Sequence, residues 1–286
     1  MSSMKAIKKR ISSVNSTKKI MKAMNLVATS KLQKAKSRLD FFRPLFDNLT
    51  NVMDGIKKGM DPDVELAFSE KRDVKNIAYI ILSSDRGLCG GFNTNVSKEA
   101  LAFIESNNDK QESILAIGTK GWEYFKRRGK NIVYRSTGPS EATSFSDSEE
   151  LGKKIAEMYR SGEVDEVYII YTRFESILAH VPCTVKLLPI STETSEQTTT
   201  SIQMEYDPDA KSFMEHAVPM YLNMSIYGAM MESAVCELAS RMTSMDSATR
   251  NATEIIDDLT LEYNRKRQGI ITQEITEIVT GANALN

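Results

Sequence analysis

Residues 7–56 read IKKRISSVNSTKKIMKAMNLVATSKLQKAKSRLDFFRPLFDNLTNVMDGI, and this stretch decides the fold. Positions taken alternately four and three apart along it are apolar, with Lys18 and Asn25 as the exceptions. We call these positions the seam: Ile7, Ile11, Val14, Lys18, Met21, Asn25, Ala28, Leu32, Ala35, Leu39, Phe42, Phe46, Leu49, Met53 and Ile56. Such a pattern keeps one stripe of a long helix against a partner helix over many turns. Because proline disrupts a helix interior, we expect a bend or a local break near Pro44.

A second amphipathic helix is predicted at the other end of the chain, over residues 211–285. Its apolar positions are Met231, Val235, Leu238, Met242, Met245, Ala252, Ile256, Leu259, Tyr263, Ile271, Ile275, Ile278 and Ala282. No proline follows Pro219, so this helix can run about 90–100 Å, against roughly 75–80 Å for the first. Two such helices can close as an antiparallel coiled coil, and the residues between them then fold as an insertion. We therefore predict three parts, a helix in residues 1–58, an inserted domain over residues 74–208 and a helix in residues 209–286.

The inserted region changes from helical to strand-like patterning. Short runs rich in Ile, Val and Tyr occupy residues 74–83, 113–118, 131–134 and 166–174. They alternate with helix-like segments near residues 95–105, 120–128 and 146–161. This order predicts a mostly parallel α/β sheet with right-handed crossovers. Residues 181–188 read as an extra strand, antiparallel at one edge, and residues 191–201 as a polar connector.

Charge is distributed unevenly along a chain whose net charge is only −1. Eleven Lys or Arg residues lie between Lys5 and Arg38, and the first acid is Asp40. Such a run can be a solvated helix face, a surface that docks onto acidic protein, or a site for phosphates or lipid. A cleaved targeting peptide is not expected, because the seam continues through the whole basic stretch.

Other features restrict the class of protein. No run of eighteen apolar residues occurs, so no membrane span is expected. Three widely spaced cysteines without a CxxC motif suggest reduced thiols in a cytosolic setting.

The segment 84–93, SDRGLCGGFN, is the one motif that suggests phosphate binding. It lacks both the GxGxxG spacing and the Gly-Lys-Ser/Thr of a P-loop, so we interpret it as a tight turn that starts a helix. The two histidines, His180 and His216, lack metal-ligand spacing, and no GxSxG elbow or isolated carboxylate pair occurs. The sequence therefore predicts no catalytic, cofactor or metal site.

Motifs spread over the whole chain resemble the gamma subunit of the F-type ATP synthase. At the N-terminus they are residues 7–20, IKKRISSVNSTKKI, and 22–32, KAMNLVATSKL. The most specific match is residues 271–284, ITQEITEIVTGANA, preceded by YNRKRQ at 263–268. The middle of the chain contributes SDRGLCGGFN, GTKG at 118–121 and VDEVY at 164–168.

The resemblance implies a rotor. In that family the coiled coil stands in the bore of a hexamer of three alpha and three beta subunits, and the α/β domain sits with the epsilon subunit on a membrane ring. Proton or sodium flow turns ring and shaft, and shaft angle is coupled to nucleotide affinity in both directions. The subunit would be non-catalytic, without cofactor, and peripheral at the cytoplasmic face of a bacterial cell membrane.

The resemblance also implies three groups of contact residues. Contacts to beta and alpha are expected at Lys9, Lys18, Lys22, Met24, Arg241, Gln273, Glu274 and Thr276. A bearing tip is expected at Ile278, Val279, Ala282 and Leu285. A foot facing ring and epsilon is expected at Tyr206 and Asp207, where Asp207 replaces the family's Glu. Plainer readings stay open, since Ile278 and Ala282 could continue the seam and Lys18 could set its register.

Three other functions remain alternatives. The chain could be a coiled-coil scaffold, or its basic helix could bind nucleic acid or lipid. The latter lacks the interleaved aromatics that stack on bases, because the first aromatic residue is Phe41. An enzyme that uses the glycine-rich segment is the third alternative.

Overall fold

The computed structural model describes residues 4–59, 73–190 and 210–284. These residues belong to two compact units, one formed by residues 1–28 with 241–286 and the other by residues 29–240. Two long helices run through both units, α1 (Met4–Gly59) and α5 (Ala210–Ala284). The predicted polar connector at residues 191–201 lies outside the described residues.

The predicted seam of α1 is confirmed over residues 7–49. Every seam position in this range is buried or half-buried, and Ile7, Leu32 and Leu39 are at most 5% exposed. Apolar residues off the seam are exposed, including Ile20 and Leu26 at 61% and 63%. Burial therefore follows heptad position rather than hydrophobicity alone, which is what packing against one partner helix produces.

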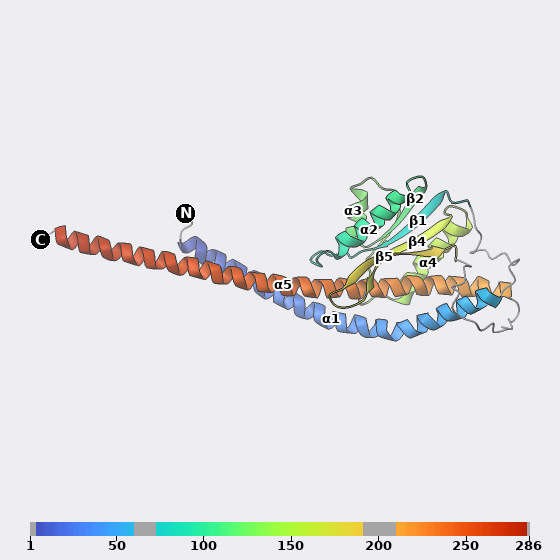
Figure 1. Ribbon diagram of the computed structural model, residues 1–286, viewed down its shortest axis with the longest axis horizontal. Helices are drawn as coiled ribbons and strands as arrows, with labels where there is room; N and C mark the ends of the chain where they lie inside the picture. The colour runs from blue at the N-terminus through green and yellow to red at the C-terminus, as the bar shows by residue number, and fades with distance from the viewer. Residues whose placement is uncertain (1–3, 60–72, 191–209, 285–286) are drawn as a thin grey trace. The chain divides into compact units, whose positions relative to one another are not determined.

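Of the bend or local break expected near Pro44, the break does not occur, because α1 continues through the proline. Figure 1 shows α1 bending in its lighter-blue half, in keeping with the expected bend. Aromatic packing on both sides of the proline stabilises the helix here. Phe42 stacks on Phe46 at 6.0 Å between ring centroids, and Phe46 stacks on Tyr221 of α5 at 6.2 Å. Phe42 also meets Tyr227 edge-on at 5.2 Å. Such pairs contribute about 0.5–1.5 kcal/mol each beyond burial, which offsets part of the roughly 3 kcal/mol that proline costs.

The inserted region forms the predicted α/β sheet. Its strands are β1 (Asn76–Leu82), β2 (Gln111–Ile117), β3 (Ile132–Ser136), β4 (Glu166–Phe174) and β5 (His180–Leu188). The spatial order is β3-β2-β1-β4-β5. All pairings are parallel except β4 with β5, so the antiparallel edge strand is confirmed.

Helices cover both faces of this sheet (Figure 1). One face packs against α2 (Phe92–Ser106) and α3 (Thr119–Lys126), through residues such as Val96 and Phe125. The other packs against α4 (Phe145–Arg160) and against α5, whose Leu222 and Ile226 join the same cluster as Ile80 of β1. Helix α5 is therefore a layer of the α/β core as well as half of the coiled coil.

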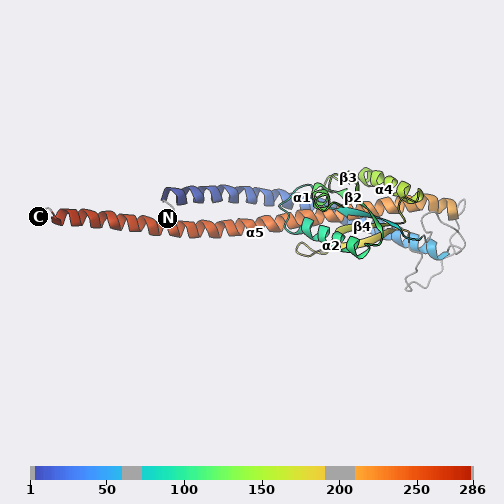
Figure 2. The ribbon, with the colours of Figure 1, turned by 90° about the horizontal axis from the view of Figure 1, so that it is seen from above.

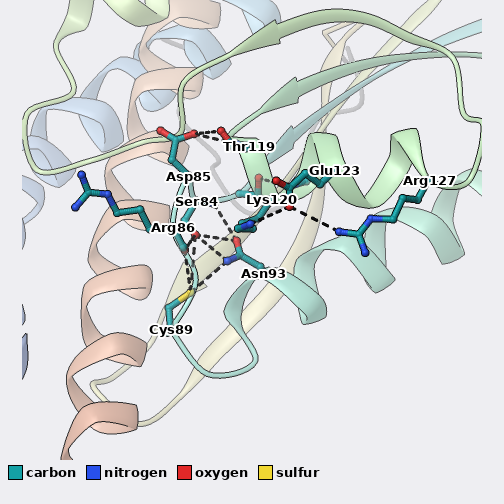
Figure 3. Close-up of polar contacts among 11 residues, drawn as sticks. Ser84, Asp85, Arg86, Cys89, Asn93, Thr119, Lys120, Glu123 and Arg127 are labelled. Carbon is teal, nitrogen blue, oxygen red and sulfur yellow. Dashed lines mark hydrogen bonds and ion pairs between the residues drawn. The ribbon is translucent and has the colours of Figure 1, made fainter. Parts of the chain in front are cut away.

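The glycine-rich segment forms the predicted tight turn, and α2 begins at Phe92 directly after it (Figure 3). Gly90 has φ 54°. Gly118, between the end of β2 and the start of α3, has φ 102°. A Cβ on Gly118 would lie 2.2 Å from the carbonyl oxygen of Ser83. Glycine is therefore required there by both backbone conformation and space.

The carboxylate of Asp85 occupies the N-terminus of α3. Its Oδ1 accepts hydrogen bonds from the Thr119 backbone N–H and hydroxyl, both at 2.9 Å, and its Oδ2 accepts one from the Gly138 N–H at 3.0 Å. A helix N-terminus favours a negative charge, and here the chain supplies that charge itself.

Helix α5 lies against the carboxyl ends of β1 and β4, where open α/β sheets often bind ligands. Ser240 donates to the carbonyl of Cys89 at 2.6 Å, and Cys236 donates to the carbonyl of Thr172 at 3.4 Å. No disulfide joins Cys89, Cys183 and Cys236, all of which the structure describes, and burial raises the pKa of the Cys236 thiol. One turn of α5 thus contacts both the loop that follows β1 and the backbone of β4.

Replacing Asp85 with alanine should destabilise the α/β core, because the N-terminus of α3 and the Gly138 amide both lose their acceptor. We expect a loss of about 1–2 kcal/mol in the free energy of unfolding. Urea unfolding followed by the fluorescence of Trp122 measures this loss. The matched control is Glu99→Ala on the exposed face of α2, with an expected change within about 0.5 kcal/mol. Equal effects of the two changes would contradict the capping role of Asp85.

Candidate partner-binding surfaces

The first candidate surface is the basic side of α1 in the unit formed with residues 241–286. Between Met4 and Ala28 this helix carries seven cations and no acid: Lys5, Lys8, Lys9, Arg10, Lys18, Lys19 and Lys22. All are exposed except Lys18, which is half-buried on the seam. Two acids of α5 in this unit pair with cations of α5 itself, Asp246 with Arg250 at 2.6 Å and Glu262 with Lys266 at 2.9 Å. The exposed cations of α1 therefore present a positive surface to any acidic partner.

A hydrogen bond on the seam sets how the two helices align. The Asn25 Nδ2 donates to the carbonyl of Met242 at 2.9 Å. Met24 and Arg241 are the neighbours of these residues in sequence, so both lie at this level of the coiled coil, and both are half-buried. The seam pattern marks Asn25 as polar, but only Lys18 was predicted as a residue that could set the register of the two helices. A polar residue on a seam is a known register device, so the signal was available.

The second candidate surface is the end of α5, residues 267–284, which we call the C-terminal extension. Every residue from 267 to 283 whose exposure is described is exposed. In both views the end of α5 runs past the start of α1 (Figure 2). The large apolar side chains there are Ile270, Ile271, Ile275, Ile278 and Val279, exposed by 41%, 44%, 56%, 71% and 52%. Contiguous exposed apolar groups indicate an interaction site.

The alternative that Ile278 continues the seam is therefore wrong. With Asn25 bonded to Met242, the antiparallel alignment places Ile7 near Leu259, and both are buried. Beyond that level α5 has no length of α1 left to pack against. The helical spacing of Ile271, Ile275 and Ile278 is real, but no helix of the described chain covers it.

The remaining predicted contact residues fall into separate places. Gln273, Glu274 and Thr276 are exposed on the C-terminal extension, away from the bonded level of Met24 and Arg241. The Gln273 Nε2 donates to Glu277 at 2.8 Å, and the Thr276 hydroxyl donates to the Thr272 carbonyl at 2.8 Å. The side chain of Ala282 is not described, and Leu285, Tyr206 and Asp207 lie outside the described residues.

Charges recur along the long helices. In α5, for example, Glu254, Asp257, Asp258 and Glu262 fall within nine residues. Among the described residues, no helix has the length and apolar character needed to cross a membrane.

Comparisons with known proteins cover nearly the whole chain. The family model described as ATP synthase matches residues 3–285. The ATP synthase gamma chain of Alkaliphilus metalliredigens is 41% identical, over 99% of this chain and 98% of that protein. The sodium-ion-specific ATP synthase gamma chain of Acetobacterium woodii is 40% identical, over 98% of both chains.

Solved structures agree on the fold. A chain of the Euglena gracilis mitochondrial ATP synthase, from a structure of its OSCP, F1 and c-ring, superposes with a TM-score of 0.69. The superposition spans 99% of the present chain and 94% of the Euglena chain, at 15% sequence identity. A chain from the central stalk and c-ring structure of the Tetrahymena thermophila mitochondrial enzyme gives a TM-score of 0.59 at 23% identity. The superposition spans 80% of the present chain and 99% of the Tetrahymena chain. The family model and the relatives in sequence, which both span nearly the whole chain, show that it belongs to the ATP synthase gamma-chain family.

Proposed function

We propose that this chain is the central rotor shaft of a rotary ATP synthase. It couples ion-driven rotation of a membrane ring to ATP synthesis, and hydrolysis to reverse rotation, at a hexamer of three alpha and three beta subunits. The observation that carries this proposal is the C-terminal extension, a helix with exposed apolar residues beyond the end of a two-helix coiled coil. Membership of the gamma-chain family supports it.

The chain acts by transmitting torque and contributes no catalytic group. Its fold supplies a long helix pair with one buried seam and a hydrogen-bonded level at Asn25 and Met242. A coiled coil held by a continuous seam resists slippage, because a shift along the axis would expose apolar side chains over many turns. The nucleotides are bound by the hexamer, and the shaft changes their affinity through its angle.

The basic side of α1 faces acidic surface of the beta subunits in this proposal. Lys9, Lys18 and Lys22 supply charge, and Met24 and Arg241 add contacts at the level of the Asn25 hydrogen bond. Attraction between opposite charges acts over several ångströms and does not demand one register. Such contacts suit a surface that meets three equivalent partners in turn.

The C-terminal extension turns inside an apolar collar of the hexamer. Gln273, Glu274 and Thr276 make polar contacts near its start, and Ile278, Val279, Ala282 and Leu285 form the bearing tip. Apolar contact is non-directional, so it holds the tip centred with less resistance to rotation than fixed hydrogen bonds would give.

Tyr206 and Asp207 form the foot that meets the epsilon subunit and the ring. Bound in this way, the chain is peripheral, at the cytoplasmic face of a bacterial cell membrane.

Assembly tests the proposal directly. The purified chain is mixed with isolated alpha and beta subunits and followed by gel filtration and ATP hydrolysis. We expect one copy to enter a complex with three of each and to sustain turnover. If the chain elutes alone and turnover does not respond to it, the rotor function is refuted.

The bearing tip is tested by the double change Ile278→Ser and Val279→Ser. Loss of apolar contact should leave assembly intact but reduce turnover by about two- to tenfold, because the tip is no longer held on the axis. Steady-state ATP hydrolysis of the assembled complex measures the effect. Thr280→Ala, on the same turn, removes no apolar contact and should retain turnover. An unchanged rate in the double variant would exclude a bearing role for these two residues.

Neutralising Lys9 and Lys22 to glutamine tests the electrostatic contact. At low salt we expect the rate of association with the hexamer to fall by about two- to tenfold. At about 0.5 M salt the difference from the unaltered chain should vanish, because screening removes the attraction. Stopped-flow association with labelled hexamer provides the rate. Lys98→Gln with Lys153→Gln, which removes equal charge from the α/β region, serves as the control, and an equal drop in its rate would contradict a specific role for α1.

A further inference from the structure

A second basic surface lies on the α/β region and is formed by other residues than the surfaces considered above. It is formed by α3, the strand β3 and the turn that joins them. Its members, which we call the α3–β3 patch, are Trp122, Tyr124, Lys126, Arg127, Arg128 and Arg135. All four cations of the patch are exposed, with the Arg127 side chain at 77%.

The single tryptophan of the chain holds two of these cations. The Lys126 Nζ lies 4.5 Å from the centroid of the Trp122 ring, and the Arg135 Cζ lies 3.9 Å from it. Lys126 comes from α3 and Arg135 from β3, so the ring gathers charges from two elements. A cation held over the face of an aromatic ring in this way is attracted by the negative potential of the ring.

Arg128 is held in the same way on a second ring. Its Cζ lies 3.5 Å from the centroid of the Tyr124 ring, and one of its N–H groups donates to the Tyr124 carbonyl at 3.0 Å. Three charged groups are thus placed by aromatic rings before any partner arrives. Placing side chains in advance lowers the entropy that binding must overcome.

The acids near the patch form ion pairs with cations other than these three charged groups, and this distinguishes the patch from an ordinary solvated helix face. Glu123 accepts from Lys120 at 2.8 Å and lies 3.7 Å from Arg127 (Figure 3), and Glu112 pairs with Lys130 at 2.8 Å. Lys126, Arg128 and Arg135 lie over aromatic rings. The hydrogen bond from Lys120 is the main cause of the lowered pKa of Glu123, and the charge of Arg135 adds a smaller part. A carboxylate can approach their N–H groups from the side away from the ring, and guanidinium groups bind carboxylates through two parallel hydrogen bonds.

The neighbouring acids and the sheet edge indicate the kind of anion. A uniform polyanion, such as a nucleic acid backbone or a lipid surface, would also meet the carboxylates of Glu123 and Glu112. A peptide can place its acidic side chains so that they avoid the carboxylates of Glu123 and Glu112. It can also cover Val133, which is 38% exposed on the last strand of the sheet. The pairing of β2 with β3 shifts register next to this residue, which disfavours addition of another strand. Recognition would therefore use side chains.

We propose that the α3–β3 patch binds an acidic polypeptide segment of a partner, whose carboxylates pair with Lys126, Arg128 and Arg135 beside Trp122. This surface shares no residue with the contacts assigned to α1 and to the C-terminal extension. Its binding therefore does not depend on the rotor function proposed above.

Trp122 reports on the patch directly. The full-length chain is titrated with a synthetic peptide of alternating glutamate and leucine, and the fluorescence of Trp122 is recorded. We expect a saturable change, which is lost when glutamine replaces glutamate in the peptide. The triple variant Lys126→Gln, Arg128→Gln and Arg135→Gln should weaken binding by about tenfold or more.

The matched control removes the same charge elsewhere, with Lys75→Gln, Lys98→Gln and Lys153→Gln, and should change the affinity by less than about twofold. Urea unfolding of both triple variants checks that each is folded. Equal weakening by the two would overturn the proposal in favour of non-specific attraction. Binding of single-stranded DNA, or of vesicles containing phosphatidylserine, as tightly as the peptide would overturn it in favour of a general polyanion site.

Discussion

Packing of apolar residues against α5 is the constraint on which the rest of this structure depends. In one unit α5 covers the seam of α1, where Ile7 and Leu259 are buried. In the other it supplies Leu222 and Ile226 to the core of the sheet. A single helix thus takes part in both hydrophobic cores. A change of register in α5 would disturb both, because each side chain of a packed core is fitted to its neighbours.

The same helix explains why a sheet of nucleotide-binding type serves as a structural element. Ser240 and Cys236 contact the backbone at the ends of β1 and β4, and Asp85 occupies the N-terminus of α3. Positions that bind phosphate in other sheets of this order are here satisfied by the chain itself. Among the exposed groups of the described residues, the cations of α1, the apolar C-terminal extension and the α3–β3 patch are suited to contact with other polypeptides.

Local patterns in the sequence were sufficient to predict most of the architecture. The seam of α1, the four parallel strands and the antiparallel strand β5 follow from periodicity and residue type, which depend on near neighbours. Local pattern could not decide between a bend and a break at Pro44, because the stacking of Phe42, Phe46 and Tyr221 that stabilises the unbroken helix involves a partner 175 or more residues away. Of the candidate site, the sequence indicated the basic stretch and the apolar end. It did not indicate the hydrogen bond between Asn25 and Met242.

By itself, the sequence determined which face of each long helix is apolar and the order of the elements, with their ends placed to within a few residues. Only the tertiary structure decided what covers each face, because that depends on how distant segments are aligned. Ile256 and Ile278 follow the same helical spacing, yet Ile256 is half-buried and Ile278 is 71% exposed. The difference arises because α1 begins at Met4 and ends its contact with α5 before Ile278 is reached. Likewise, the contact of Arg135 with Trp122 exists only because β3 pairs beside the strand that leads into α3.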